Sequence, residues 1–429
     1  MAGRAFKAGV AAAALMGAAG AVMVGSTGAA HAGAFMLREQ STYGQGASFA
    51  GVAAPGDSIS SMYWNPAAVT TAVGLVFESN HTFISPHADF DPDSRTSPLL
   101  GALVPGDGGD LGVDAYLPSS YTAYQVNEDL YLGLSINTPF GLATHADRPW
   151  VGQVDHLRAK VLSVNVAPTI GYKINDQISI ALGAQIQYFN VDLTRALLPT
   201  PTSPTANLSG DDFGFGFTAG VTFEPTEGTT IGLGFRSAIA QSLEGELVSP
   251  ASPGGLPITA DLTLPEMVTL GVRQRVNDQF TLLAGIEWTN WSRLGIVDVD
   301  NAAAGTVTEL DFEYQDGWFF SLGAEYAWND NLTLRSGLGY EISPVRDEFR
   351  SARLPDANRI WASVGFTYEV NERLSFDAAY THLFGEESDI NRTNALPGGL
   401  GLPATVTYAG STEASADIVA VSLRYKLGG

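Results

Sequence analysis

The sequence predicts an all-β protein and, within that class, a 14-stranded antiparallel transmembrane β-barrel. Three observations support this prediction. A short turn centred on asparagine recurs along the chain, apolar and polar residues alternate between the turns, and the N-terminus has the pattern of an export signal. Together they indicate an exported chain that crosses a membrane with strands.

Recurring turns set the number of strands. Five turns carry Asn in second position, at residues 126–129, 174–177, 276–279, 328–331 and 370–373, and Pro-Thr-Glu-Gly at residues 225–228 fills the long gap. Their spacing of about 50 residues exceeds one hairpin but suits a strand, a long loop, a second strand and a short turn. Six short turns separate seven hairpins, which gives 14 strands with tight turns at one end and long loops at the other.

The segments between turns show the period of two expected for strands with two unlike faces. Residues 130–136, 213–224 and 419–427 alternate in this way. A soluble β-sandwich also alternates. A strand length of about ten residues, the contrast between short turns and long loops, and aromatic residues near strand ends favour the membrane barrel. These aromatic residues are Trp288, Trp291, Trp318, Tyr326, Trp328, Trp361 and Tyr368.

Residues 1–32 have the pattern of a signal peptide. Arg4 and Lys7 precede an Ala-rich apolar run, and Ala30-His31-Ala32 has the small-x-small form of a cleavage site, so the mature chain is expected to begin at Gly33. Beyond this point no apolar run approaches the roughly 18 residues that a spanning helix needs. Insertion then requires a closed barrel, and we expect the bacterial outer membrane as its location.

The chain is strongly acidic, with 45 Asp and Glu against 22 Lys and Arg and a formal net charge of -23. This balance argues against a nucleic-acid partner, whose phosphates would be repelled. Many acids fall in expected loops, where they keep the loops soluble and allow divalent ions to bridge to an anionic leaflet. We expect outer-membrane lipid and lipopolysaccharide as partners, no nucleic acid, and a monomer.

One segment does not fit the barrel pattern. Residues 33–71 are rich in Gly, Ala and Ser and lack sustained alternation, so they are not expected to form a strand pair. This divides the mature chain into residues 33–71 and a barrel at residues 72–429. The first segment has to lie either outside the wall or inside it.

Several motifs in this segment resemble the N-terminal hatch of the FadL/TodX-type family of outer-membrane transporters for long-chain fatty acids and other hydrophobic compounds. They are Gly33-Ala34-Phe35, Gln40, Gly44, Gly46, Gly51, Asp57 and Asn65-Pro66-Ala67. The likeness covers nearly the whole mature chain and continues in residues 138–142, Trp150, Glu287-Trp288-Thr289-Asn290-Trp291-Ser292 and residues 354–359. The resemblance implies a 14-stranded barrel with the hatch inside its lumen.

The resemblance also implies a passive route. A ligand is captured between extracellular loops, passes to an internal pocket, and leaves sideways through a gap in the wall once the hatch rearranges. A fatty acid gains roughly 0.8 kcal/mol for each methylene kept in apolar surroundings. Phe35, Leu37, Phe140 and Leu142 are candidates to line such a pocket, although for each of them simple packing of the plug is the alternative.

Two prolines mark a possible gap in the wall. Pro168 interrupts an otherwise strong strand, where it cannot donate a ladder hydrogen bond, and Pro139 ends the strand before it. A local break in strand pairing is one interpretation, and a harmless bulge is the other.

A carboxylate ligand calls for a cation. Arg158 and Arg335 lie in or beside predicted strands, and the alternation around Leu332, Leu334 and Ser336 places Arg335 in the lumen. Both are candidates to bind a headgroup. The alternative for Arg335 is an ion pair with a lumenal acid, for which Glu287 and Glu341 are available.

Other functions fit less well. Residues 46–50 lack the second glycine of a nucleophile elbow, and Asp89, Asp91 and Asp93 lack the later Gly and Glu of a calcium loop. We therefore expect no enzyme, no metal site and no cofactor. Transport of hydrophobic compounds, most of all long-chain fatty acids, leads. The alternatives are an uptake channel for aromatic or alkane hydrocarbons, a general polar porin and, behind these, a purely structural or adhesive barrel.

Overall fold

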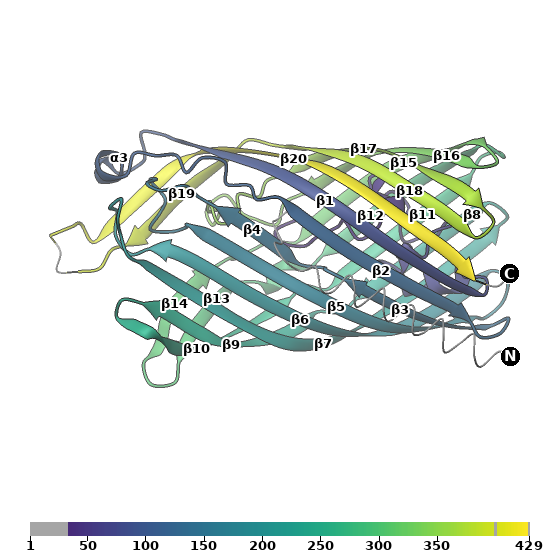
Figure 1. Ribbon diagram of the computed structural model, residues 1–429, viewed down its shortest axis with the longest axis horizontal. Helices are drawn as coiled ribbons and strands as arrows, with labels where there is room; N and C mark the ends of the chain where they lie inside the picture. Colours follow the sequence, from purple (N-terminus) through teal and green to yellow (C-terminus); the bar gives the residue numbers. More distant parts are fainter. Residues whose placement is uncertain (1–32, 399–400, 428–429) are drawn as a thin grey trace.

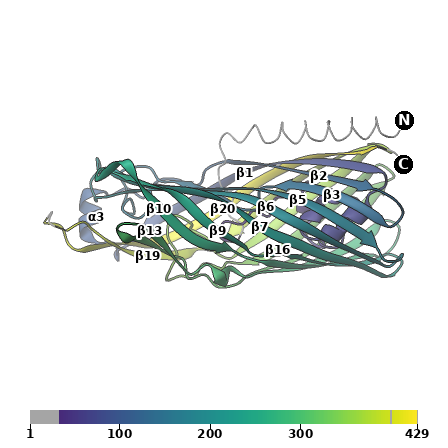
Figure 2. The same cartoon turned by 90° about the horizontal axis from the view of Figure 1, so that it is seen from below.

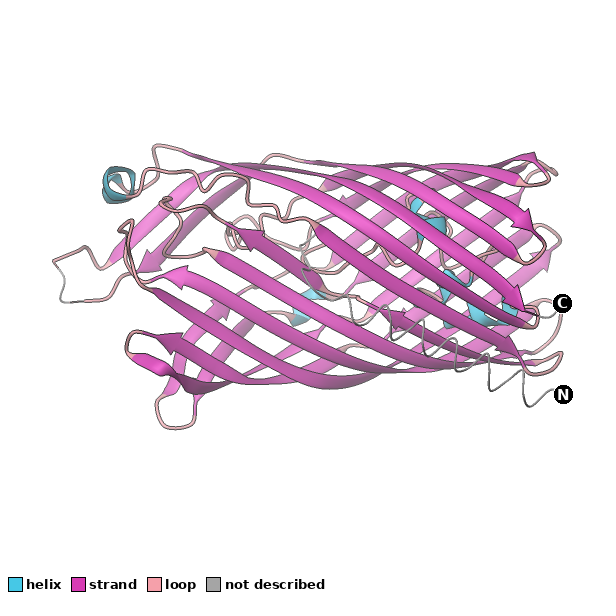
Figure 3. Ribbon diagram, in the orientation of Figure 1, coloured by secondary structure: helices cyan, strands magenta, loops and turns pink. Residues whose placement is uncertain are grey.

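The computed structural model describes residues 33–398 and 401–427, so the expected signal peptide at residues 1–32 lies outside the described part. All its strands belong to one antiparallel sheet that closes into an elongated barrel (Figures 1 and 3). The short helices are α2 (Thr42–Gln45), α3 (Pro98–Leu103) and the 3-10 helices η1 (Ile59–Tyr63), η2 (Pro66–Thr71) and η3 (Trp291–Arg293). No helix within the described residues is long and apolar enough to cross a membrane.

Fourteen strands of the described chain form the closed ring, which confirms the number predicted from the turns. They are β1 (Leu75–Pro92), β2 (Ala115–Gln125), β3 (Leu130–Asn137), β5 (Arg158–Lys173), β6 (Ile178–Ala196), β7 (Thr205–Thr226), β8 (Thr229–Arg236), β11 (Met267–Arg275), β12 (Phe280–Thr289), β15 (Gly317–Asn329), β16 (Leu332–Ile342), β17 (Arg359–Asn371), β18 (Leu374–Gly385) and β20 (Thr405–Leu427). The ring closes where β1 pairs with β20, from Leu75 opposite Leu427 to Pro92 opposite Gly410.

Shorter strands extend the wall toward the long loops. They are β4 (Gly141–His145), β9 (Ile239–Ser249), β10 (Ser252–Leu264), β13 (Ile296–Asn301), β14 (Gly305–Asp311) and β19 (Ser388–Ala395). β3 and β4 both pair with β5, β8 and β9 both pair with β7, and β18 and β19 both pair with β20. The wall is therefore regular at the turn end and broken into pieces at the loop end.

The Asn turns work through their side chains. The Oδ1 of Asn127 accepts hydrogen bonds from the amides of Asp129, at 2.9 Å, and Leu130, at 2.8 Å. The same pair of contacts forms at Asn175, Asn277, Asn329 and Asn371. An Asn that caps its own turn in this way closes two strands within a few residues, which explains why the motif repeats.

Alternate residues face lipid and lumen, as the period of two predicts. On β7, Phe213, Phe215 and Phe217 are exposed, Phe215 by 70%, whereas the glycines between them lie on the other face. The aromatic residues near strand ends were expected to face the membrane interface. Two of them, Trp291 and Trp361, are instead buried inside the molecule. Proximity to a strand end did not reveal which face each ring occupies.

Residues 33–71, which we call the hatch, lie within the ring (Figure 2, purple). All of them are buried except Gly56, Asp57 and Thr71. Hydrogen bonds tie the hatch to distant parts of the wall: Thr42 donates to Asn80 of β1, at 2.9 Å, and Ser48 donates to Ser363 of β17, at 2.7 Å. The hatch therefore spans the lumen.

Lumen-facing glycines make room for the hatch backbone. A Cβ atom on Gly232 would lie 1.8 Å from the carbonyl oxygen of Ala53, and one on Gly234 would lie 1.8 Å from that of Trp64. Neither distance is sterically possible. Glycine in these strands is thus required by the approach of a second backbone.

The Asn-Pro-Ala motif anchors the end of the hatch. The Asn65 side-chain amide donates to Ala53 O, at 2.8 Å, and to Val221 O of β7, at 3.0 Å, while its oxygen accepts from Ala67 N, at 3.0 Å. Pro66 occupies the first turn of η2, where no backbone donor is needed. Asn65 thus caps η2 and fastens it to the wall at once.

Candidate functional site

The wall is interrupted where β3 ends. Beyond Asn137 the chain turns inward and pairs with the hatch: Leu37 N donates to Pro139 O, at 2.8 Å, and Gly141 N donates to Phe35 O, at 2.9 Å. β2 pairs with β3 only over residues 120–125, so residues 115–119 have a ladder on the β1 side alone. The structure thus places Pro139 at a break in pairing between β2 and β3.

Pro168 lies on β5, opposite Leu134 of β3, with its ring on the exposed outer face. The β5–β6 ladder lacks its pairs at residues 167 and 168 and resumes in the same register from Thr169 opposite Gly183. Strand pairing with β3 continues past the proline on its other side. Pro168 thus interrupts the β5–β6 ladder for two residues, whereas at Pro139 the pairing of β3 with β2 has ended.

The four apolar candidates come together behind this break. Phe35 packs against Phe140 with ring centroids 5.9 Å apart and against Trp291 of η3 at 4.8 Å, and Leu37 lies beside Gly141. Phe35, Leu37, Phe140 and Leu142 are all buried. They fill the space with one another, and the cavity beside Phe140 and Pro139 measures only about 20 Å³. In this state they pack the hatch and do not line an open pocket.

A larger cavity of about 360 Å³ lies at the loop end, above the hatch. Its walls come from β6, β7, β9, β14, β19 and residues 345–354, and its apolar part includes Leu193, Leu208, Leu247, Leu310 and Phe312. The guanidinium groups of Arg195, Arg353 and Arg392 line the same cavity. Apolar walls with a few charged groups are typical of a small-molecule site, and the volume falls within the usual range of about 300–1,000 Å³.

One buried carboxylate lies among these cations. Asp155 accepts a hydrogen bond from the Tyr408 hydroxyl, at 2.7 Å, and its Oδ1 is 3.7 Å from Nη2 of Arg353. Burial raises the pKa of Asp155, but the charges of Arg353 and Arg392 and the Tyr408 hydrogen bond hold it below its ordinary value. Asp155 is therefore ionised and neutralises part of the positive charge.

The remaining positive charge has no fixed partner in the described part of the chain. Neither Arg195 nor Arg392 forms an ion pair there, and Nε of Arg392 is buried without a hydrogen bond. Glu309 and Asp311 also line the cavity, on the exposed side of β14. The cavity therefore combines apolar walls with three arginines and three acids, and two of the arginines, Arg195 and Arg392, form no ion pair within the described residues. Free guanidinium groups beside apolar walls suit an amphiphile with an anionic head.

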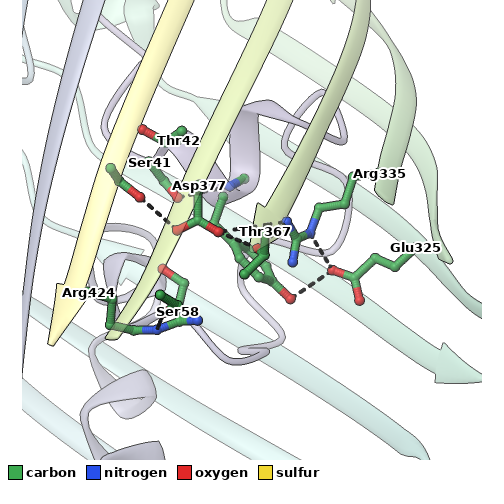
Figure 4. A network of polar contacts seen from close by, with 12 residues as sticks. Ser41, Thr42, Ser58, Glu325, Arg335, Thr367, Asp377 and Arg424 are labelled. Carbon is green, nitrogen blue, oxygen red and sulfur yellow. Dashed lines mark hydrogen bonds and ion pairs between the residues drawn. The ribbon is translucent and has the colours of Figure 1, made fainter. Parts of the chain in front are cut away.

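Arg335 lies elsewhere. It faces the lumen, as the alternation predicts, and is buried beneath the hatch, where its guanidinium lies 3.7 Å from the ring centre of Tyr43. It donates to Glu325, at 2.9 Å, and to Thr367, at 2.6 Å, and Figure 4 shows it held between these two residues. It does not line the 360 Å³ cavity.

The acids suggested as alternatives for Arg335 have other partners. Glu287 and Glu341 both bind Arg38 of the hatch, at 2.7 and 3.2 Å, and Glu341 also pairs with Arg359. The structure gives Arg335 the ion pair that was stated as the alternative to headgroup binding, but its partner is Glu325, with Asp377 at 3.8 Å. Alternation gives the face of a side chain and not its neighbour across the lumen.

Arg158 points away from the lumen. It is exposed at the start of β5 and shares its face with the exposed Ile170 and Tyr172. The sequence prediction missed the three cavity arginines. Alternation along β6 places Arg195 inward with Phe189, whereas Arg353 belongs to a loop in which no periodicity was available.

Comparison with known proteins agrees with this architecture. A family model described as "Outer membrane protein transport protein (OMPP1/FadL/TodX)" matches residues 23–427. The long-chain fatty acid transport protein of Escherichia coli K12 is 27% identical over 402 residues, covering 83% of this chain and 89% of that protein. Outer membrane protein P1 of Haemophilus influenzae is 25% identical over 443 residues, covering 92% and 95%.

Solved structures show the same fold. The crystal structure of a Pseudomonas aeruginosa FadL homologue superposes with a TM-score of 0.82 at 23% identity, covering 92% of this chain and 99% of that one. The toluene transporter TodX of Pseudomonas putida superposes with a TM-score of 0.62 at 16% identity, covering 86% and 94%.

Proposed function

This chain belongs to the OMPP1/FadL/TodX family of outer membrane transport proteins, and from that premise we propose that it admits long-chain fatty acids by passive diffusion. The observation that carries the proposal is the 360 Å³ cavity, in which apolar walls meet Arg195, Arg353 and Arg392. A fatty acid offers one carboxylate and one apolar tail. Its head would pair with the guanidinium groups while its tail stays against the leucine walls.

The route onward leads to the break beside β3. Phe35 and Phe140 pack together behind this break, and we infer that this contact closes the passage from the cavity. Only two backbone hydrogen bonds, at Leu37 and Gly141, join this part of the hatch to residues 139–141. A small retreat of the hatch would separate Phe35 from Phe140 and connect the cavity to the wall. Diffusion down a concentration gradient needs no cofactor, and one chain suffices because it closes its own ring.

An aromatic hydrocarbon is the second candidate. The cluster of Phe35, Phe140, Phe189 and Trp291 offers ring faces and edges that would suit it, and the toluene transporter TodX shares the fold. Such a ligand carries no charge, so the cavity arginines would have no group on it to bind. A general polar porin fits less well, because the hatch fills the lumen.

Paired binding measurements separate these candidates. We expect Arg353→Ala and Arg392→Ala to weaken oleate binding to the purified protein by about 10- to 150-fold, the range for a hydrogen bond to a charged group, and to leave toluene and hexadecane unaffected. Arg275→Ala is the matched control, since Arg275 lies in an exposed ion pair at the turn end. Wild-type protein that binds toluene but not oleate would overturn the proposal and favour the second candidate.

A further inference from the structure

Basic side chains gather around a second hollow, on the outer surface of the barrel near the loop end. This hollow measures about 460 Å³ and is lined by His145, Arg148, Arg158 and Thr194, with the buried Ala146 and Leu157 at its base. It shares only Thr194 with the cavity of the proposed function.

Strand pairing fixes the outward direction of this hollow. Residues opposite each other on neighbouring strands point to the same face. His145 is opposite Arg158, and Arg158 is opposite Thr194. The residues that alternate with Arg158, Ala159 and Val161, are buried. His145 and Arg158 therefore project from the outside of the wall.

The hollow lies at the height of the lipid headgroups. The outward residues of β5 from Leu162 to Tyr172 are apolar or aromatic, namely Leu162, Val164, Val166, Pro168, Ile170 and Tyr172. Ten strand residues at about 3.3 Å each, tilted by about 40°, rise about 25 Å, which is the height of the apolar band on an outer-membrane barrel. Lys160 and Arg158 are the next outward residues and thus enter the headgroup layer.

The charge of the hollow is unusual for this molecule. Although the chain has a net charge of -23, no acid of its described part lines this hollow. Arg158 and Lys160 form no ion pair with any residue in the described ranges. Arg148 donates one hydrogen bond from Nη2 to the carbonyl oxygen of Ser203, at 2.8 Å. Asp147 lies 3.9 Å from His145, and Asp192 faces Lys160 across the strands. The guanidinium groups of Arg148 and Arg158 remain available to an anion.

We propose that this hollow binds a phosphate group of lipopolysaccharide in the outer leaflet. Guanidinium groups bind phosphate oxygens in a fork geometry, and two arginines from neighbouring segments provide such forks at the height where a phosphorylated glycolipid presents its head. Ala146 and Leu157 give the bound sugar an apolar floor. The bound lipid fastens the loop end of β4 and β5 to the leaflet.

The test uses full-length protein in nanodiscs with bisphosphorylated lipid A as the probe. We expect the Arg148→Gln/Arg158→Gln double variant to bind lipid A about 10-fold or more weakly than wild type, as expected for two charge-assisted contacts, while Arg275→Gln binds like wild type. Wild type should bind dephosphorylated lipid A as weakly as the double variant binds the phosphorylated form. Each single variant should show part of the loss if the double variant fails to fold.

Equal affinity of wild type for the two forms of lipid A would overturn the proposal, as would an unchanged affinity in the double variant. Inorganic phosphate that binds as tightly as lipid A would show a free-ion site and also overturn it. Oleate binding should be unchanged in the double variant, so the lipid site and the proposed transport function succeed or fail separately.

Discussion

Ion pairs fix individual side chains inside the barrel, and Arg335 is the clearest example. It is shared by Glu325, Thr367 and Asp377, while Tyr43 of the hatch covers its guanidinium. Arg273 binds the same Glu325. The arrangement connects β11, β15, β16, β17 and β18 beneath the hatch. Arg273 and Arg335 therefore hold the hatch in place, whereas the sequence made Arg335 a candidate for binding a ligand.

We expect Arg335→Ala to destabilise the folded hatch by about 1–3 kcal/mol, because Glu325 and Asp377 each lose a buried partner while Glu325 keeps Arg273. Hydrogen exchange of the hatch amides should become faster, and the affinities for oleate and hexadecane should change equally. Arg373→Ala, at an exposed turn, is the control. A loss confined to oleate would return Arg335 to the ligand site.

Glu39 of the hatch gives the plug a dependence on pH. Its carboxylate is buried and no other residue of the described chain donates a hydrogen bond to it. Burial raises its pKa to about 7, against the lowering effect of its own backbone amide and of the charges of Arg38 and Arg359. At pH values between 4.5, the ordinary pKa of this carboxyl group, and about 7, Glu39 is protonated in the folded hatch and ionised in the unfolded chain. Stability therefore falls as the pH rises through this window.

We expect Glu39→Gln to remove this dependence and to stabilise the hatch by about 3 kcal/mol at pH values above the window. The measurement is hydrogen exchange of hatch amides at pH 5 and pH 8, corrected for the intrinsic exchange rate. Wild type should open more readily at the higher pH and the variant should not. A wild-type hatch equally stable at both pH values would contradict the role of Glu39.

At the scale of elements, the hatch and the wall are adapted to each other. Gly232 and Gly234 of β8 leave space that Ala53 and Trp64 occupy, and Asn65 joins η2 to β7. The strand ladders that close the ring do not include the hatch. The hatch therefore lies in the lumen without taking part in the ladders that hold the ring together.

Deletion of residues 33–71 should leave the ring folded and raise its ion conductance in a planar bilayer well above that of wild type. The reason is that the lumenal charges, such as Glu287 and Arg335, would then face water. Folding of the deletion variant is checked by its heat-dependent migration on a gel. Unchanged conductance would show that the hatch does not block the pore.

At the scale of the whole molecule, every strand of the ring has a neighbour on both sides at the turn end, because β20 closes onto β1. No open sheet edge is left there to meet lipid. The break beside β3 lies higher in the wall, where the hatch supplies the missing hydrogen bonds to residues 139–141. Closure at the turn end leaves the ring paired there, and the interruption beside β3 is where we propose the side exit.

The closed ring should resist sodium dodecyl sulfate without heating and migrate faster than the boiled protein, since unfolding requires many ladder hydrogen bonds to break together. Gel electrophoresis of heated and unheated samples measures this directly. Identical migration in both samples would argue against a closed barrel in the membrane.

The sequence by itself determined the features that depend on local chemistry. Asn127 and its counterparts cap their own turns, so the turns gave the number of strands, and alternation placed Phe215 toward lipid and Arg335 toward the lumen. Only the tertiary structure decided which residues meet across the lumen. Arg335 pairs with Glu325 and not with Glu287, Trp361 lies inside, and Arg353 reaches Asp155 from a distant loop. Strand period specifies a face, whereas partners across the lumen depend on the curvature of the wall and the path of the hatch, which have no local signature.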